Sequence, residues 1–184
     1  ENFRYGLVNV STQMYIKSNL GGFKGFSGHC SYNRTNGAML VPDPEGNFKE
    51  VLQICRIEDK RLVYKKQGVV WNFPSSSEGC VKVELCVIKS GVKISLTDRW
   101  YNPVDETVGD EAAISFNVTK RGDWQTIIVK YNTNTMKAKI IVGDDEKEVE
   151  LKAYAPNGLS YLHIQTIAEE EDQSGTLIRS FEKF

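Results

Sequence analysis

Apolar and polar residues alternate along most of this chain, and that period of two limits the possible folds more than any other feature. The run Val92–Thr97 places its apolar side chains on even positions, and residues 136–140 and 149–153 repeat the pattern. Successive side chains of a strand point to opposite faces, so the alternation predicts strands with one face on a core and one in water. No stretch of twelve or more residues carries an apolar stripe at helical spacing. The sequence therefore predicts an all-β chain.

Further strands are expected throughout the chain, separated by turn residues such as Ser90-Gly91 and Pro156-Asn157-Gly158. The expected ranges are roughly 3–10, 12–18, 37–42, 48–58, 61–66, 68–73, 112–119, 124–131, 159–168 and 176–182. About a dozen short strands without long helices favour an antiparallel β-sandwich of the jelly-roll type. A chain of 184 residues has room for one such domain with a sizeable core, so we expect a single domain over residues 1–184. A lipocalin-like barrel is the alternative at this length, but the C-terminal helix expected of one is missing from the pattern.

Charge and hydropathy exclude several classes of partner. The chain has 23 Lys and Arg against 24 Asp and Glu, a net charge of −1, which removes the general electrostatic argument for binding nucleic acid or an anionic membrane. No apolar run approaches the roughly 20 residues that a transmembrane helix needs, so no transmembrane segment is expected. The first residue is Glu1 rather than Met, so we expect that any signal peptide or tag is removed or lies outside this sequence.

The cysteines and glycosylation motifs favour a secreted protein. None of the four cysteines has the C-x-x-C spacing of a zinc or thioredoxin-type site, and an even number permits two disulfides of unknown pairing. These are Cys30, Cys55, Cys80 and Cys86. Three N-x-S/T motifs predict glycosylation at Asn9, Asn33 and Asn117. We therefore expect an extracellular glycoprotein with disulfides; the alternative is a cytosolic protein with four buried thiols.

The order of features from about Val81 to the end resembles the concanavalin A-like jelly rolls, a group that includes laminin-G modules, some sialidase lectin domains and several polysaccharide lyases. The resemblance lies in Gly122-Asp123-Trp124, in the apolar run that follows Trp124, and in a hairpin over residues 136–151. It covers about half of the chain. The resemblance implies a curved sheet able to bind glycan, and it carries over no catalytic residue.

Two segments depart from the strand pattern and are candidates for function, since long loops of a sandwich often carry it. Residues 19–38 are rich in Gly and aromatic side chains, and residues 98–111 are polar and acidic. In the second, Trp100 is flanked by Arg99 and Tyr101, a combination suited to stacking on a sugar ring and fixing its hydroxyls. Alternatively, Trp100 has only a structural role and covers one end of the sandwich. Trp71 and Trp124 are expected in the core.

A polar stripe is predicted on the strand at 159–168, where Tyr161, His163 and Gln165 share one face. On a concave sheet this stripe could hydrogen-bond sugar hydroxyls, or Tyr161 and His163 could act as base and acid in a small lyase or hydrolase. Ordinary polar residues on a half-exposed face are the simpler interpretation. No G-x-S-x-G motif or phosphate-binding loop is present, so nucleophilic catalysis and nucleotide binding have no support.

Acidic residues of the 98–111 segment could hold calcium, for which Asp105 and Asp110 are the candidate ligands; no other cofactor is expected. The leading hypothesis is a secreted sandwich that binds a carbohydrate without covalent chemistry. The alternatives are the small lyase or hydrolase, and an extracellular module that binds another protein, such as a receptor-binding or immune-modulating factor, through residues 19–38 or a sheet face.

Overall fold

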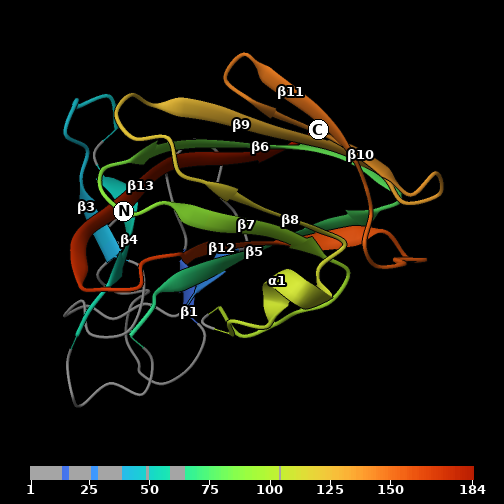
Figure 1. Ribbon diagram of the computed structural model, residues 1–184, viewed down its shortest axis with the longest axis horizontal. Coiled ribbons are helices and arrows are strands. Elements are labelled where there is room, and N and C mark those ends of the chain that lie inside the picture. The colour runs from blue at the N-terminus through green and yellow to red at the C-terminus, as the bar shows by residue number, and fades with distance from the viewer. Residues whose placement is uncertain (1–13, 17–25, 29–38, 49, 59–64, 104) are drawn as a thin grey trace.

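The computed structural model describes residues 14–16, 26–28, 39–48, 50–58, 65–103 and 105–184, and it shows two antiparallel β-sheets packed face to face (Figure 1). Sheet A contains, in spatial order, β1 (Met14–Ile16), β2 (Phe26–Gly28), β5 (Gly68–Ser76), β12 (Leu159–Thr166), β7 (Val92–Thr97) and β8 (Ile114–Val118). Sheet B contains β11 (Asp145–Glu150), β10 (Lys137–Val142), β9 (Gln125–Asn132), β6 (Glu78–Val87), β13 (Asp172–Lys183), β4 (Glu50–Arg56) and β3 (Met39–Pro42). The predicted all-β sandwich is confirmed.

The core lies between the sheets and follows from the period of two. Val92, Ile94 and Leu96 of β7 are fully buried and face the core, while Lys93 and Ser95 point to the outer face of sheet A. Trp71 belongs to the core, as expected, and stacks on Phe181 of the opposite sheet with ring centroids 5.8 Å apart. Strands 3–10 and 61–66 of the sequence prediction lie outside the described residues.

Several elements differ from their predicted extents. β13 begins at Asp172 rather than at residue 176, and register shifts interrupt its pairing with both neighbours, which a search for strict alternation does not detect. The one helix among the described residues, α1, is a single turn at Val108–Glu111, on the outer side of sheet A (Figure 1). No helix in the described part of the chain is long and apolar enough to span a membrane.

Trp124 is not in the core between the sheets, contrary to the prediction; it packs, half-buried, against a second and smaller hydrophobic cluster. The buried residues of β9 that face the core are Ile127, Val129 and Tyr131, all at odd positions, so the even-numbered Trp124 lies on the outer face of sheet B. There its ring stacks on the guanidinium of Arg179, with the cation 3.6 Å from the ring centroid. Trp124 lies outside because side chains alternate between the two faces of the sheet and the odd-numbered ones face the core.

No disulfide joins Cys55, Cys80 and Cys86 to one another, and Cys30 lies outside the described residues. Cys80 and Cys86 are six residues apart on β6, which places their Cα atoms roughly 20 Å apart. Cys55 is on β4, and β13 separates that strand from β6, a gap of about two strand spacings or roughly 9.6 Å. Both separations exceed the roughly 7 Å limit for a bridge, so a disulfide between any two of these three is a wrong prediction.

Candidate functional site

Tyr161, His163 and Gln165 lie on the outer face of sheet A, because Leu162 and Ile164 between them face the core. β12 is a central strand of the sheet, with β5 on one side and β7 on the other. In register with His163 are Val70 on β5 and Ser95 on β7. The three side chains therefore form one stripe along the middle of the sheet, as the alternation indicates.

The stripe is not open to solvent, because the segment 98–107 crosses over it. We call this segment the strap; its residue 104 lies outside the described residues. The amide nitrogen of Gln165 donates to the carbonyl oxygens of Pro103 and Asp105, at 2.8 and 2.7 Å. The ring of Tyr101 meets that of His163 edge-on, with centroids 5.9 Å apart. Gln165 is 7% exposed and His163 is 0% exposed, so the prediction of a half-exposed stripe is wrong for these two residues.

A glycine permits this close approach. A Cβ atom at Gly68 would lie 2.0 Å from the carbonyl oxygen of Pro103, a distance that real Cβ contacts do not reach. Gly68 is on β5, in register with Gln165. The strap is thus held to the sheet at one point: Gly68 leaves room for the backbone of Pro103, and the neighbouring Gln165 donates a hydrogen bond to it.

His163 has no access to a substrate. Burial holds its pKa far below the usual 6.5, at about 3, and the neighbouring Asp105 carboxylate offsets only part of that effect. Its Nε2 lies 3.2 Å from the Thr97 hydroxyl, and its buried Nδ1 has no hydrogen-bond partner within the described structure. The ring is neutral at ordinary pH and covered by Tyr101. This arrangement does not support the acid and base pair of the lyase hypothesis.

The other predicted ligand-binding residues lie on the strap itself. Arg99 is exposed and holds the Asp98 carboxylate with two hydrogen bonds, from Nε at 3.0 Å and from Nη2 at 3.2 Å. The indole of Trp100 is 39% exposed, whereas Tyr101 packs inward and burial raises its pKa. Tyr161, at the same end of the stripe, stays half-buried. Trp100 and Arg99 are the two that face solvent.

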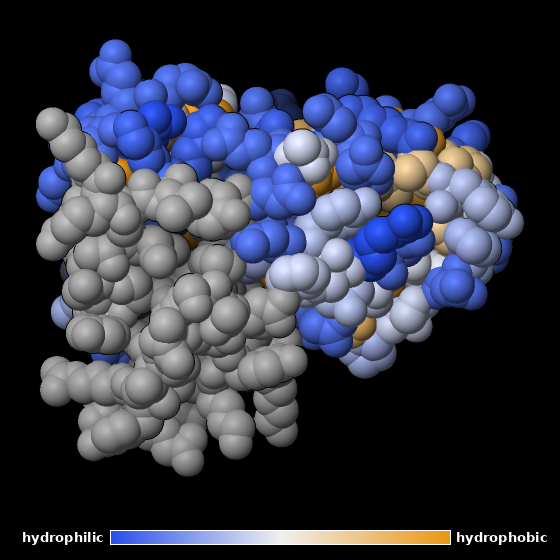
Figure 2. Space-filling model, turned by 90° about the horizontal axis from the view of Figure 1, so that it is seen from below, coloured by the Kyte–Doolittle hydropathy of each residue, from blue (hydrophilic) through white to orange (hydrophobic). Residues whose placement is uncertain are grey.

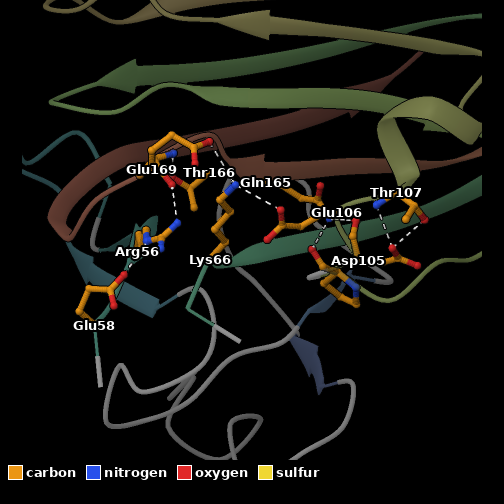
Figure 3. Close-up of polar contacts among 11 residues, drawn as sticks. Arg56, Glu58, Lys66, Asp105, Glu106, Thr107, Gln165, Thr166 and Glu169 are labelled. Carbon is orange, nitrogen blue, oxygen red and sulfur yellow. Dashed lines mark hydrogen bonds and ion pairs between the residues drawn. The ribbon is translucent and has the colours of Figure 1, made fainter. Parts of the chain in front are cut away.

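A hollow of about 190 Å³ opens at the other end of the stripe. The ammonium of Lys66 lies 3.3 Å from a carboxylate oxygen of Glu106 and 3.4 Å from one of Glu169 (Figure 3). The two carboxylates are well exposed, while the Lys66 side chain is only 19% exposed. Lys66 lies just before β5, Glu106 belongs to the strap and Glu169 follows β12. Three charged groups from distant parts of the sequence therefore converge on this hollow.

Amide, hydroxyl and further amine groups complete the lining. Gln165 and Lys93 contribute from β12 and β7, and Asn117 from β8, where it is in register with Lys93. The side chain of Lys93 packs against Gly109, since a Cβ there would lie 2.8 Å from its Cδ. Within the described residues, the Lys93 ammonium makes no ion pair or hydrogen bond. The remaining lining residues are Gln67, Thr166 and Ile167.

The structure separates the predicted site into two parts. Gln165 borders the hollow, whereas Arg99, Trp100, Tyr101 and Tyr161 lie toward the opposite end of β12. Lys66, Lys93, Glu106 and Glu169 were not predicted as ligand-binding residues. Of these residues, only Lys93 could have been found from the sequence, because the alternation in Val92–Thr97 places its side chain on the outer face.

The predicted calcium ligands are close in sequence but have different surroundings. The Asp105 carboxylate accepts hydrogen bonds from the Thr107 amide at 2.9 Å and from its hydroxyl at 2.8 Å, and Asp110 is exposed on α1. No group of three or more His, Cys, Asp or Glu side chains in the described part of the chain is arranged to hold a metal ion. Asn117 is exposed on the edge strand β8, while Asn9 and Asn33 lie outside the described residues. Glycosylation and calcium binding stay predictions.

Solved structures place this fold in a known class. A sialidase aligns with 74% of this chain at 14% identity and a TM-score of 0.52, and this chain spans only 15% of that longer one. Peanut lectin, solved with a nine-residue peptide, aligns with 80% of this chain and 88% of its own at 10% identity, also with a TM-score of 0.52. The fold is a concanavalin A-like jelly roll.

Sequence identities of 10–14% show that the fold is shared and say nothing about the function of this site. A family 7 alginate lyase aligns with 79% of this jelly roll and 82% of its own chain, at 11% identity and a TM-score of 0.45. No protein-family model and no curated protein matches the sequence. The resemblance expected from residues 81 onward is confirmed at the level of the fold.

Proposed function

We propose that this jelly roll binds a carbohydrate non-covalently in the hollow beside Lys66. The observation that carries the proposal is the convergence of Lys66, Glu106 and Glu169 on a concave surface with amide and hydroxyl walls. Sialidase and lectin relatives in fold are consistent with such a role. The face that holds the hollow, seen from the side of α1, is predominantly hydrophilic where it is described (Figure 2).

The chemistry of the lining suits vicinal hydroxyl groups. A sugar hydroxyl donates one hydrogen bond and accepts others, so it needs acceptors and donors on the same wall. Glu106 and Glu169 supply acceptors, Lys66 and Lys93 supply donors, and Asn117 supplies both. Hydrogen bonds to charged groups are the stronger kind, worth about 1.5–3 kcal/mol each. The exposure of both carboxylates leaves them free to exchange their bond with Lys66 for bonds with a ligand.

A glycan array followed by calorimetry on the best ligand tests the proposal. Lys66→Ala should weaken binding about tenfold to a hundredfold, because it removes one charged donor and releases both carboxylates. Lys65→Ala is the matched control: Lys65 is the adjacent lysine, it pairs with Glu58, and it does not line the hollow. Equal affinity of the two variants would refute this site.

The same array separates the remaining hypotheses. A signal that a chelator abolishes would support a calcium site at Asp105 and Asp110. A blank array from folded protein would refute carbohydrate binding and leave protein recognition as the leading alternative. Secretion stays a prediction, and isolation of the native protein with N-linked glycan on Asn9 or Asn33 would support it.

A further inference from the structure

The hollow continues toward the edge of sheet A along one row of side chains. Gln165 on β12, Lys93 on β7 and Asn117 on β8 are in register, and all three line the hollow from the outer face of the sheet. Among the described strands β8 is the last one of sheet A on this side, and Asn117 is exposed there. The row therefore leads from the middle of the sheet to its edge.

A second cavity begins where this row ends. It measures about 520 Å³ and lies between β8 of sheet A and strands β10 and β11 of sheet B; we call it the edge cleft. Asn117 lines both cavities. The hollow, at about 190 Å³, is smaller than the roughly 300–1,000 Å³ of typical small-molecule sites, whereas the edge cleft lies within that range. The two cavities together offer a ligand a longer surface, which passes around the edge of β8.

The inner walls of the edge cleft are apolar. Ile114 and Ile140 belong to the core cluster between the sheets. Three further wall residues pack against that cluster while remaining half-buried: Phe116, Val142 and Val149. The two sheets therefore leave an aromatic ring and aliphatic side chains partly uncovered at this edge. The C–H faces of a sugar ring gain from packing on such a surface, because both are removed from water.

The rim of the edge cleft carries charges of both signs. The acidic residues are Asp145, Glu146 and Glu150, and the basic ones are Lys147 and Lys152. Asp145 and Lys147 share the inner face of β11, whereas Glu146, on the outer face, pairs with Lys139. Three carboxylates beside two ammonium groups favour neither an anion nor a cation strongly. They place hydrogen-bond acceptors and donors side by side, which is what the hydroxyl groups of a neutral sugar require.

From the shared Asn117, the apolar walls and the mixed rim we infer that the ligand is a neutral oligosaccharide that occupies both cavities. One ring lies in the hollow, the chain crosses the edge of β8 at Asn117, and the following rings pack on Phe116 with their hydroxyl groups toward the rim. This inference rests on the proposed function and extends it from a single sugar to a chain of linked rings.

The dependence of affinity on chain length tests the inference. Calorimetry, with ligand-detected NMR for weak ligands, compares one to six rings of neutral gluco-, manno-, galacto- and xylo-oligosaccharides. The protein is produced without N-linked glycan, because a glycan attached to Asn117 would occupy the crossing. In a series that binds, the affinity should rise at least tenfold from one ring to four, because the added rings make contacts in the edge cleft.

The outcomes distinguish this inference from the proposed function. Equal affinity for one ring and four rings would overturn the inference and leave carbohydrate binding in the hollow intact. Failure of all four neutral series, together with a positive signal for acidic sugars on the glycan array, would overturn it in the same way. A blank array would refute both.

Variants of the edge cleft test the same point. Val149→Phe places a ring in the cleft and should lower the affinity for a four-ring ligand at least tenfold without affecting a single ring. Its matched control, Ile141→Phe on the outer face of β10, should change neither affinity. If Val149→Phe does not fold, Lys152→Ala removes an exposed donor from the rim and should weaken only the four-ring ligand, about fivefold. Lys66→Ala should weaken both ligands by the same factor, because its contact lies in the hollow. Unchanged four-ring affinity in folded Val149→Phe or in Lys152→Ala would exclude the edge cleft from the binding site.

Discussion

Acidification should destabilise this protein through His163, before its carboxylates are protonated. In the folded chain His163 is fully buried under the strap with a pKa of about 3, whereas an unfolded chain has a histidine pKa of about 6.5. Below pH 6.5 the unfolded state therefore binds a proton that the folded state does not bind. The folded pKa is the lower one, so stability is lost as the pH falls from 6.5 toward 3.

The size of the effect follows from one proton. Each pH unit in this window is worth about 1.4 kcal/mol, so the free energy of unfolding should fall by about 2–3 kcal/mol between pH 7.5 and pH 4.5. The measurement is urea unfolding across this range for the wild type and for His163→Asn, which cannot take up the proton. Other titrating groups, including His29, act alike in both proteins, so the difference between the two curves isolates His163.

The wild-type curve should fall more steeply than that of His163→Asn at every pH below 6.5. Parallel curves would refute the reasoning, because they would mean that the folded state protonates His163 as readily as the unfolded chain does. Such a result would mean that water reaches the His163 ring and that the strap does not lie against the sheet.

Three further substitutions test other contacts. Arg179→Met should lower the free energy of unfolding by about 3–5 kcal/mol, since it leaves the buried Asp43 carboxylate without its cation; a loss below about 1 kcal/mol in urea unfolding would contradict this. Gly68→Ala should push Pro103 off the sheet and speed hydrogen exchange in the strap, and unchanged exchange would show that the strap is not held there. Trp100→Ala should change stability by less than about 0.5 kcal/mol, and should weaken glycan binding several-fold if the ligand extends along the strap; unchanged affinity would confine the ligand to the hollow.

The sheets themselves could be predicted from the sequence. Alternation is a local property, so Val92, Ile94 and Leu96 could be assigned to a core, and Tyr161, His163 and Gln165 to a common face, without knowledge of any partner. The turn residues between the strands favoured antiparallel neighbours for the same local reason. Where the register shifts, as in β13, the local rule failed and the strand was predicted too short.

What covers each face could not be predicted, because that depends on segments far apart in the chain. Residues 98–107 show no repeating pattern of apolar and polar residues, so their sequence does not indicate where they pack. The strap covers His163 because it contacts Gln165 and Gly68, which are distant in the chain. Similarly, Lys66 joins Glu106 and Glu169 only because the start of β5, the end of β12 and the strap come together beside one sheet. The sequence determined which residues form strands and which way their side chains point. Tertiary structure alone decided which of those faces stay open, because burial is set by the element packed opposite and not by the residue's own neighbours.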